Sequence, residues 1–391
     1  MEFVIWLSLI FALGAAVGSF LNVCIYRLPL EKSILWPAAS HCGHCYQPIR
    51  WYDNIPLASY WILRGRCRTC GQRFSIRYFF VELLTALLIA GLFFLEVERN
   101  VHRLDPALLG PERFALARWL FFGFHTVLLC FLLVATFCDF DHQIIPLPLT
   151  LWGTALGLIG ACLWAWPWPY SPEEMARSLP AAHSGPRSWL ILRQSPLAAL
   201  YPWPIWWPLP HFLQPGGNWR TGLATGLAGS LAGTILLRAV RFLFGFGMGA
   251  EYMEPAAPET AETPTWFVGR WFSWLQRVGG KALGLGDADL MMMAGAFLGW
   301  QPVLVAFFVA VLPGLIFALA QLALRGGNVL PFGPALAIGT IATMLGWPWI
   351  GPAVQPLFFD STLLAVLGGL CGILMLVFGY LLRVRRLVRR S

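Results

Sequence analysis

The sequence predicts an all-α polytopic membrane protein. Of its 391 residues, 58% are hydrophobic and only 12% are charged, whereas an ordinary soluble domain has about 25% charged residues. Several uncharged apolar runs are long enough to cross roughly 30 Å of hydrocarbon as helices. None alternates with the period of two that a membrane barrel requires. Backbone groups in lipid need partners within their own segment, so each run is interpreted as a helix.

We expect about nine spans, with eight or ten as the alternatives. The pair 288–300 and 302–324 could form one broken helix, although Gly299-Trp300-Gln301-Pro302 is typical of a turn. The expected spans cover residues 3–26, 79–95, 115–137, 147–166, 221–237, 288–300, 302–324, 335–350 and 362–382.

Basic residues predict the orientation of these spans. Segment 27–78 contains eight Lys or Arg residues but only two acids, Glu31 and Asp53, and such segments face the cytoplasm. The amino terminus is therefore expected outside. Nine spans return the arginine-rich carboxyl terminus to the cytoplasm. The net charge of +8 then reflects basic residues gathered at the cytoplasmic face of the lipid bilayer, and no nucleic-acid partner is needed to explain it.

This topology divides the chain into four parts and two insertions. The insertion at 164–219 holds eight of the 20 Trp and 11 of the 29 Pro residues, as expected of an outer loop on the membrane surface. The insertion at 249–283 is expected to be a cytoplasmic linker that ends in an interfacial amphipathic helix. The four parts are a first transmembrane helix at 1–26, a small cytoplasmic four-cysteine domain at 27–78, a membrane core at 79–350, and an extra transmembrane helix with a basic tail at 351–391.

Four of the nine cysteines form two pairs, Cys42-Gly43-His44-Cys45 and Cys67-Arg68-Thr69-Cys70. A two-residue gap lets both thiolates of a pair reach one ion about 2.3 Å away, so Cys42, Cys45, Cys67 and Cys70 are the expected ligands of a structural zinc ion. The alternative is two disulfides. They require an oxidising compartment, whereas the charge pattern places this loop in the reducing cytosol. A nearby histidine could also replace one thiolate.

Two carboxylates stand at the ends of otherwise apolar spans. Asp139 closes the third span, and Asp287 opens the sixth within Gly284-Leu285-Gly286-Asp287. The expected topology puts both at the cytoplasmic face. Two acids that meet across a water can share one proton: the charged acid takes a proton from water, and the neutral acid polarises a scissile carbonyl. Asp139 and Asp287 are therefore the candidate catalytic pair.

A purely structural role is the alternative for these acids. An acid at a helix amino terminus is favoured by about 0.3–1 kcal/mol, so capping alone could account for Asp287. The same dipole disfavours Asp139 at a helix carboxyl end, where capping gives no explanation. Asp141 and Asp289 lie two positions further along, about 200° around a helix, and are expected to face elsewhere.

Several short motifs occur in a fixed order along the chain. They are Gly18-Ser19-Phe20-Leu21-Asn22-Val23, Tyr26-Arg27-Leu28-Pro29, Asp53-Asn54-Ile55-Pro56, Arg64-Gly65-Arg66-Cys67, Ser75-Ile76-Arg77-Tyr78, Val81-Glu82-Leu83, Asp139 seven residues before Pro146, Gly284-Leu285-Gly286-Asp287 and Pro331-Phe332-Gly333-Pro334. The ordered series resembles the type IV prepilin peptidases, which are bifunctional leader peptidases and N-methyltransferases of bacterial inner membranes.

The resemblance covers about 1–160, 220–247 and 283–350. It implies that 79–350 is an intramembrane aspartic peptidase core with the GxGD motif, and that Asp139 and Asp287 are its catalytic pair. The implied substrate is a type IV prepilin or a type II secretion pseudopilin, cut after a Gly at the cytoplasmic membrane face. The exposed amine would then be methylated from S-adenosylmethionine.

The chain departs from the family's pattern beside these motifs. Asp289 stands where the family usually has Lys, and Leu147 stands where an Asp commonly follows Pro146. Both catalytic aspartates are present, while methyl transfer is supported by the resemblance alone. Three alternatives stay open: a peptidase without methyl transfer, a transporter coupled to protons or cations, and a non-catalytic assembly protein. The inverted repeats typical of many transporters are not found.

Overall fold

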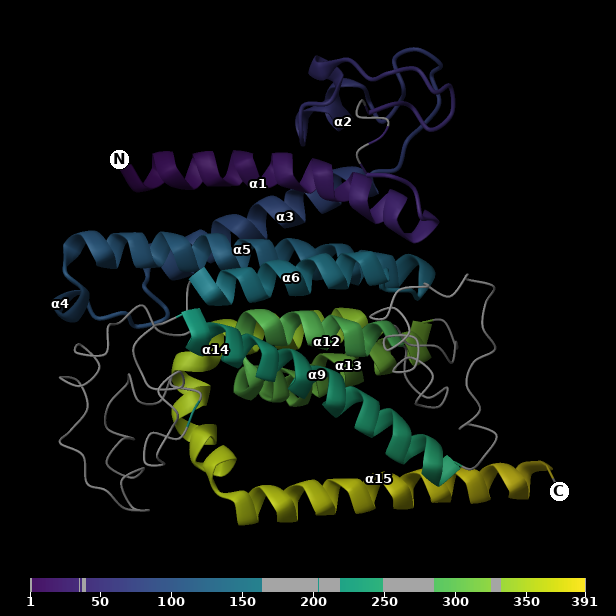
Figure 1. Ribbon diagram of the computed structural model, residues 1–391. Helices are drawn as coiled ribbons and strands as arrows, with labels where there is room; N and C mark the ends of the chain where they lie inside the picture. Colours follow the sequence, from purple (N-terminus) through teal and green to yellow (C-terminus); the bar gives the residue numbers. More distant parts are fainter. Residues whose placement is uncertain are drawn as a thin grey trace. The chain divides into compact units, whose positions relative to one another are not determined.

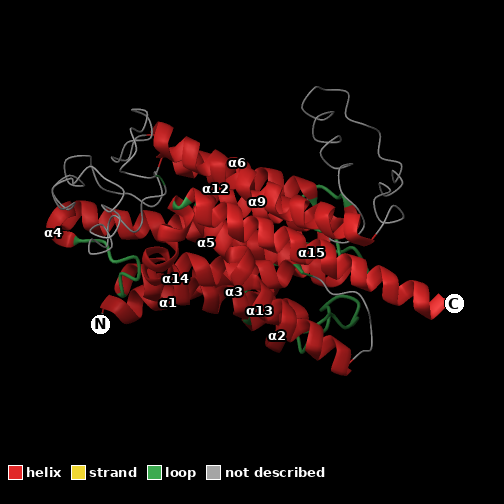
Figure 2. Ribbon diagram, turned by 90° about the horizontal axis from the view of Figure 1, so that it is seen from below, coloured by secondary structure: helices red, strands yellow, loops and turns green. Residues whose placement is uncertain are grey.

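The computed structural model describes residues 2–34, 36, 40–163, 203, 219–248, 285–324 and 332–390. Within these ranges the regular elements are helices (Figure 2), so the all-helical prediction is confirmed. Two isolated β-bridges accompany them. In chain order (Figure 1) they are α1 Glu2–Arg27, η1 Leu28–Leu30, η2 Trp51–Asp53, α2 Ala58–Ile62, α3 Arg77–Phe93, the π-helical turn η3 Phe94–Glu98, α4 Pro106–Leu109, α5 Pro111–His142, α6 Leu147–Leu163, α9 Trp219–Met248, α12 Leu285–Leu298, α13 Trp300–Leu324, α14 Gly333–Phe359 and α15 Ser361–Arg390.

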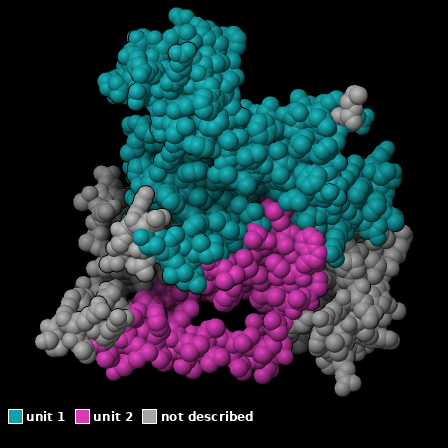
Figure 3. All heavy atoms as spheres, turned by 180° about the vertical axis from the view of Figure 1, so that it is seen from behind, with its two compact units in different colours: residues 1–153, 313–341 teal, residues 154–312, 342–391 magenta. Residues whose placement is uncertain are grey.

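The chain divides into two compact units, which Figure 3 distinguishes by colour. Unit 1 comprises residues 1–153 and 313–341, and unit 2 comprises residues 154–312 and 342–391. The division falls inside three helices, α6, α13 and α14.

Each of the nine expected apolar runs coincides with a helix. Among the described residues, six helical segments can cross a membrane by length and composition: Glu2–Leu30, Arg77–Glu98, Pro111–His142, Trp219–Gly247, Trp300–Gln321 and Thr362–Val384. The count of nine spans therefore stays a prediction, as does their orientation. The expected insertion at 164–219 lies outside the described residues, apart from Trp203 and Trp219, the first residue of α9. The expected insertion at 249–283 lies outside them entirely.

The expected break between the sixth and seventh apolar runs is confirmed. Helix α12 ends at Leu298, and α13 begins at Trp300. Gly299 between them has a φ of 84°, a left-handed conformation that glycine adopts at little cost. A Cβ at Gly299 would lie 2.8 Å from Thr225 Cγ2, so a larger residue would also be too close to α9.

In unit 1, helices α1 and α3 approach each other through glycine (Figure 1). Gly14 and Gly18 are four residues apart and face α3. A Cβ on Gly14 would lie 2.9 Å from Ala86 Cα, and one on Gly18 would lie 2.7 Å from Glu82 Cα. Small residues spaced by four let helices pack closely where lipid offers no hydrophobic driving force. The amino-terminal motif therefore has a packing role.

In unit 2, α9 and α12 pack even more closely. A Cβ on Gly229 would overlap the carbonyl oxygen of Gly295, and one on Gly233 would overlap that of Met291. Four residues forward along α9 thus correspond to four residues back along α12, so the two helices are antiparallel. Continued along both helices, this register brings the second half of α9 to the start of α12, where Asp287 and Asp289 lie.

Helix α9 continues well beyond the expected boundary at residue 237. The span was expected to end there because Arg238 and Arg241 interrupt the apolar run. Both arginines instead belong to the helix, and the side chain of Arg238 lies 3.7 Å from Asp289 on α12. Acids on the neighbouring helix therefore allow these cations to be buried.

The packing of α9 on α12 yields a stability prediction. Gly229→Ala should lower the free energy of unfolding by about 1–3 kcal/mol, because its methyl group forces two backbones apart. Gly369→Ala on α15 is the matched control, since a Cβ there meets nothing within 4 Å and alanine favours a helix by up to about 1 kcal/mol. Thermal unfolding of the purified protein in detergent compares the two. Equal midpoints for wild type and Gly229→Ala would contradict the packing argument.

Candidate active site and metal centre

Asp139 lies in the last turn of α5 and is buried, with 6% of its surface exposed. The helix ends just beyond it at Gln143, whose φ of 55° is left-handed and whose N–H donates to the Asp139 carbonyl at 2.9 Å. The Asp139 carboxylate accepts a hydrogen bond at Oδ2 from the backbone N–H of Gly333, at 2.9 Å. A distant segment therefore fixes this acid.

Gly333 can reach Asp139 only because it has no side chain. A Cβ at that position would lie 2.6 Å from Asp139 Oδ2 and 3.1 Å from Asp139 Cγ. Gly333 belongs to the late motif identified from the sequence, which gave no indication of its partner. The two residues are 194 positions apart, and nothing local in either segment relates them.

Asp141, two residues further along, has a different partner. Its carboxylate forms an ion pair with Arg77 at the start of α3, with 2.7 Å from Arg77 Nη1 to Oδ1 and 2.5 Å from Nη2 to Oδ2. The guanidinium group also lies 5.3 Å from the ring centre of Phe137. The pair joins the end of α5 to the start of α3, so Asp141 has a structural contact that Asp139 does not share.

Asp287 lies in the first turn of α12 and is buried, with 7% of its surface exposed. Asp289 follows it on the same helix and is also buried. Two cations of α9 lie beside them: Arg238 pairs with Asp289 at 3.7 Å, and Arg241 is close enough to Asp287 to interact with it electrostatically. The first turn of α12 is thus a buried site where two acids face two arginines.

The structure places the two candidate acids in different units, Asp139 in unit 1 and Asp287 in unit 2. Their convergence on one water molecule stays a prediction. Each acid is nevertheless buried at a helix end within its own unit, and each has a partner from a distant segment.

The four predicted zinc ligands come together in unit 1. Their sulfur atoms all lie within 4.8 Å of one another, and Cys42 Sγ is 3.9 Å from Cys70 Sγ. A tetrahedral ion with 2.3 Å bonds to sulfur has ligand atoms about 3.8 Å apart. A disulfide requires about 2.05 Å, and all four cysteines are free thiols here. The donor set and its spacing therefore fit a metal ion.

The two cysteine pairs sit in matching loops. A β-bridge closes each loop, His41 with Pro48 and Arg66 with Arg73. The N–H of the first cysteine of each pair donates to a glutamine carbonyl five residues on, at 3.0 Å in the first loop and 2.8 Å in the second. The shared pattern Cys-x-x-Cys-x-Gln, which the sequence analysis did not recognise as a repeat, predicts this correspondence.

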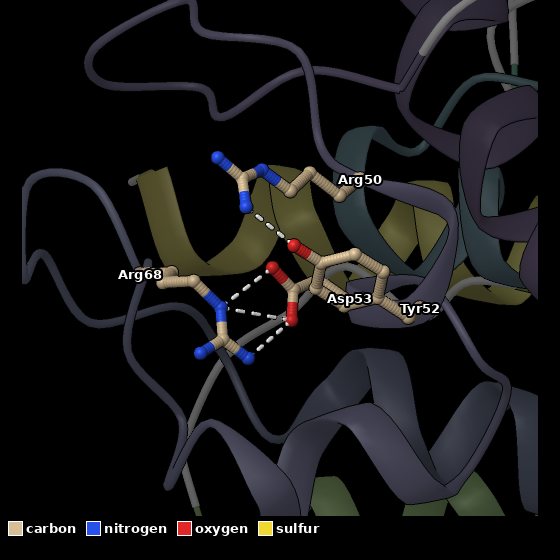
Figure 4. Close-up of polar contacts among 4 residues, drawn as sticks. All are labelled: Arg50, Tyr52, Asp53 and Arg68. Atoms are coloured by element: carbon tan, nitrogen blue, oxygen red, sulfur yellow. Dashed lines mark hydrogen bonds and ion pairs between the residues drawn. The ribbon is translucent and has the colours of Figure 1, made fainter.

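The buried acid Asp53 links the segment between the two cysteine loops to the second loop, which contains Cys67 and Cys70. Asp53 ends η2 and accepts hydrogen bonds from Arg68 Nε at 2.8 Å and Nη2 at 2.6 Å (Figure 4). These bonds hold the pKa of Asp53 below its usual value. Tyr52 beside it accepts from Arg50 at 2.5 Å and lies under the guanidinium group of Arg68. Arg68 stands between the two cysteines of its pair, so Asp53 helps to position them.

The four-cysteine segment is also anchored to the helices. The N–H of Leu57, which has a left-handed φ of 64°, donates to Glu82 Oε2 on α3 at 2.8 Å. Asn22 of α1 donates to the carbonyl of Tyr78 at the start of α3 at 3.1 Å. Motif residues of α1, the cysteine segment and α3 therefore form one connected structure.

Known proteins resemble this sequence. A family model for the bacterial peptidase A24 N-terminal domain matches residues 12–95, the stretch that contains α1, the cysteine loops and α3. The prepilin leader peptidase/N-methyltransferase of Myxococcus xanthus is 42% identical over 151 residues, which make up 38% of each chain. The type 4 prepilin-like proteins leader peptide-processing enzyme of Escherichia coli O78:H11 is 29% identical over 349 residues, covering 85% of this chain and 90% of that protein. This chain belongs to the prepilin peptidase A24 family.

Similarity to other A24 relatives extends over most of the chain. The prepilin leader peptidase/N-methyltransferase of Pectobacterium carotovorum is 29% identical over 365 residues, covering 87% of this chain and 93% of that protein. No solved structure matches the chain. At Asp289, where the resemblance leads one to expect Lys, the structure places a positive charge nearby from Arg238 on α9.

The contact between Asp139 and Gly333 yields a prediction. Gly333→Ala should lower the free energy of unfolding by about 1–3 kcal/mol, because the added methyl group displaces a hydrogen bond to a buried acid. Gly346→Ala on the same helix is the control, since its Cβ meets only the flexible end of Ile350. Thermal unfolding in detergent measures both variants. A Gly333→Ala midpoint as high as that of Gly346→Ala would contradict the contact.

Proposed function

We propose that this chain is an intramembrane aspartic endopeptidase that removes the leader from type IV prepilins or pseudopilins and then N-methylates the new amino terminus. The observation that carries this proposal is the 29% identity over 85–87% of the chain to relatives named for prepilin leader processing. Six helices able to cross a membrane agree with a multi-pass protein of the bacterial membrane. We place it in the inner membrane, with the amino terminus outside and the carboxyl terminus in the cytoplasm.

Asp139 and Asp287 are the proposed catalytic pair, sharing one proton around a hydrolytic water. The charged carboxylate takes a proton from the water, and the neutral carboxyl donates a hydrogen bond to the scissile carbonyl oxygen. Two observations support these assignments: both acids are buried, and Asp139 accepts a hydrogen bond from Gly333 while Asp287 lies within electrostatic range of Arg241. The bond from Gly333 holds Asp139 in place before the substrate arrives, which lowers the reorganisation that the reaction requires.

The proposed topology explains how such a substrate reaches the acids. A prepilin has a short basic leader in front of an apolar helix. With nine spans, Asp139 and Asp287 lie at the cytoplasmic membrane face, where the leader meets that helix. The core at 79–350 would receive the helix sideways from the lipid, while the segment at 27–78 stays in the cytoplasm.

Methyl transfer is the second proposed activity. S-adenosylmethionine would supply an electrophilic methyl group, and the amine exposed by cleavage would be the nucleophile. The names of the relatives support this step, and no residue of the chain is assigned to it.

The four cysteines are proposed to hold a structural zinc ion. Their chemistry and the 3.9 Å separation of Cys42 and Cys70 support zinc, and four thiolates leave no open coordination position. Zinc would join the two loops and thereby fix the Asp53 segment between them. We also propose the division of the chain into parts 1–26, 27–78, 79–350 and 351–391, which follows from the expected membrane spans.

The catalytic pair is tested by conservative substitution. Asp139→Asn and Asp287→Asn should each abolish leader removal from a co-expressed pilin precursor, because neither amide can share a proton with the remaining acid. Asp360→Asn is the control, since Asp360 is exposed at the start of α15 and caps that helix. Mass spectrometry of the pilin amino terminus reads both cleavage and methylation. Complete leader removal by either active-site variant, at normal protein levels, would exclude the pair.

The zinc proposal predicts a change in metal content. Cys67→Ser should lose one equivalent of zinc and make residues 27–78 more sensitive to protease, because metal binding stabilises such loops. Cys371→Ser, an exposed cysteine of α15, should keep the wild-type zinc content. Elemental analysis of the purified protein measures the difference. Equal zinc in both variants would contradict the assignment.

A further inference from the structure

Unit 1 contains a second cluster of possible metal ligands, formed by Glu96, His102 and His125. One ligand atom from each residue lies within 4.8 Å of those of the other two. All three residues are buried, with exposed fractions of 1%, 5% and 0%. His125 lies inside the apolar helix α5. Buried acids and imidazoles in a membrane-spanning segment are costly and call for a physical reason.

Both imidazoles approach the same oxygen of Glu96. Oε1 lies 2.9 Å from His102 Nε2 and 2.5 Å from His125 Nδ1. The other oxygen, Oε2, is buried and has no hydrogen-bond partner among the residues that the structure describes. An unpartnered carboxylate oxygen costs free energy in a protein interior. The cluster therefore contains a buried carboxylate of which only one oxygen, Oε1, is hydrogen-bonded.

The backbone around the cluster is specialised for holding these side chains. Glu96 lies in the π-helical turn η3 that continues α3, and such turns are frequent at functional sites. His102 lies in the next loop, between Asn100 and Arg103, which have left-handed φ values of 49° and 54°. Asn100 closes that loop with two side-chain hydrogen bonds to Leu104, at 2.8 and 3.0 Å. Two non-glycine residues in this conformation indicate a loop held in a required shape.

Two explanations compete for the cluster. In the first, one histidine is protonated and the three groups form a hydrogen-bonded ion pair, which leaves Oε2 without a partner. In the second, a cation lies among them. A tetrahedral ion bound at 2.0–2.2 Å separates its ligand atoms by about 3.3–3.6 Å, so the side chains would move slightly apart from their 2.5 and 2.9 Å contacts to bind one. The cation satisfies the carboxylate, so the second explanation accounts for more of the structure.

We propose that Glu96, His102 and His125 bind a divalent metal ion of the zinc type. Two imidazole nitrogens and a carboxylate oxygen suit such an ion, and they leave one position for a further ligand. The near-complete burial of all three side chains indicates a structural ion that joins η3 and the following loop to α5. The site is separate from the four cysteines, which precede α3, whereas Glu96 follows it. Twenty helical residues place the two sites roughly 30 Å apart.

Metal counting tests the proposal on the full-length protein, purified without a histidine tag and equilibrated with zinc. Wild type should hold two equivalents. A variant with all four loop cysteines changed to serine should keep one, and adding Glu96→Gln should remove it. His142→Ala, an exposed histidine at the end of α5, is the matched control and should keep two. One equivalent in wild type, or none in the serine variant, would overturn the proposal.

Cobalt spectroscopy provides a test in which the cluster itself is not mutated. The four-serine variant loaded with Co²⁺ should show visible ligand-field bands without the thiolate charge-transfer absorption that a cysteine site gives. The bands should disappear when the ion is removed by a chelator and return when it is added back. A featureless visible spectrum after Co²⁺ loading would reject a metal site at these three residues.

Discussion

Close approach of helix backbones through glycine underlies the arrangement of both units. In a chain with 58% hydrophobic residues, lipid tails are as apolar as the side chains, so burial alone gives helices little reason to associate. Gly14 and Gly18 bring α1 onto α3, and Gly229 and Gly233 bring α9 onto α12. Backbones this close gain many van der Waals contacts and allow only one register. That register then decides which charged residues meet.

The buried acids follow from this arrangement. Asp139 accepts a hydrogen bond from the N–H of Gly333, and Asp289 pairs with Arg238, and each partner comes from a distant part of the chain. Because a charge inside a span is costly, an acid there is stable only where the fold brings such a partner to it. The same contacts fix the orientation of the carboxylates, which is a requirement for the proposed chemistry. Packing and proposed catalysis thus rely on the same interactions.

Local patterns in the sequence predicted the elements well. The nine apolar runs coincide with helices, the break at Gly299 lies where the turn was expected, and the four cysteines come together as their spacing indicated. Each of these features depends on residues that are close in the chain. Helix α9 continues past the expected end of its apolar run at residue 237, because Arg238 and Arg241 lie beside acids of α12.

The long-range contacts of the candidate site could not be predicted in this way. Gly333 reaches Asp139 across 194 residues, and Glu96 meets His125 across 29, without any periodicity that relates them. The π-helical turn that positions Glu96 has no sequence signature, and no neighbour of His125 in its apolar run points to Glu96. The predicted convergence of Asp139 and Asp287 depends on how the two units are arranged, which no local pattern encodes.

The antiparallel contact of α9 with α12 also makes the angular phase of α9 important. Each residue rotates a helix by 100° about its axis, so one residue inserted between Gly233 and Arg238 would swing both arginines to another side while the glycine contacts stayed intact. Only length changes near whole turns, such as seven residues, would return the guanidinium groups to α12. The electrostatic surroundings of the GxGD motif are therefore tied to the length of a neighbouring helix as closely as to its composition.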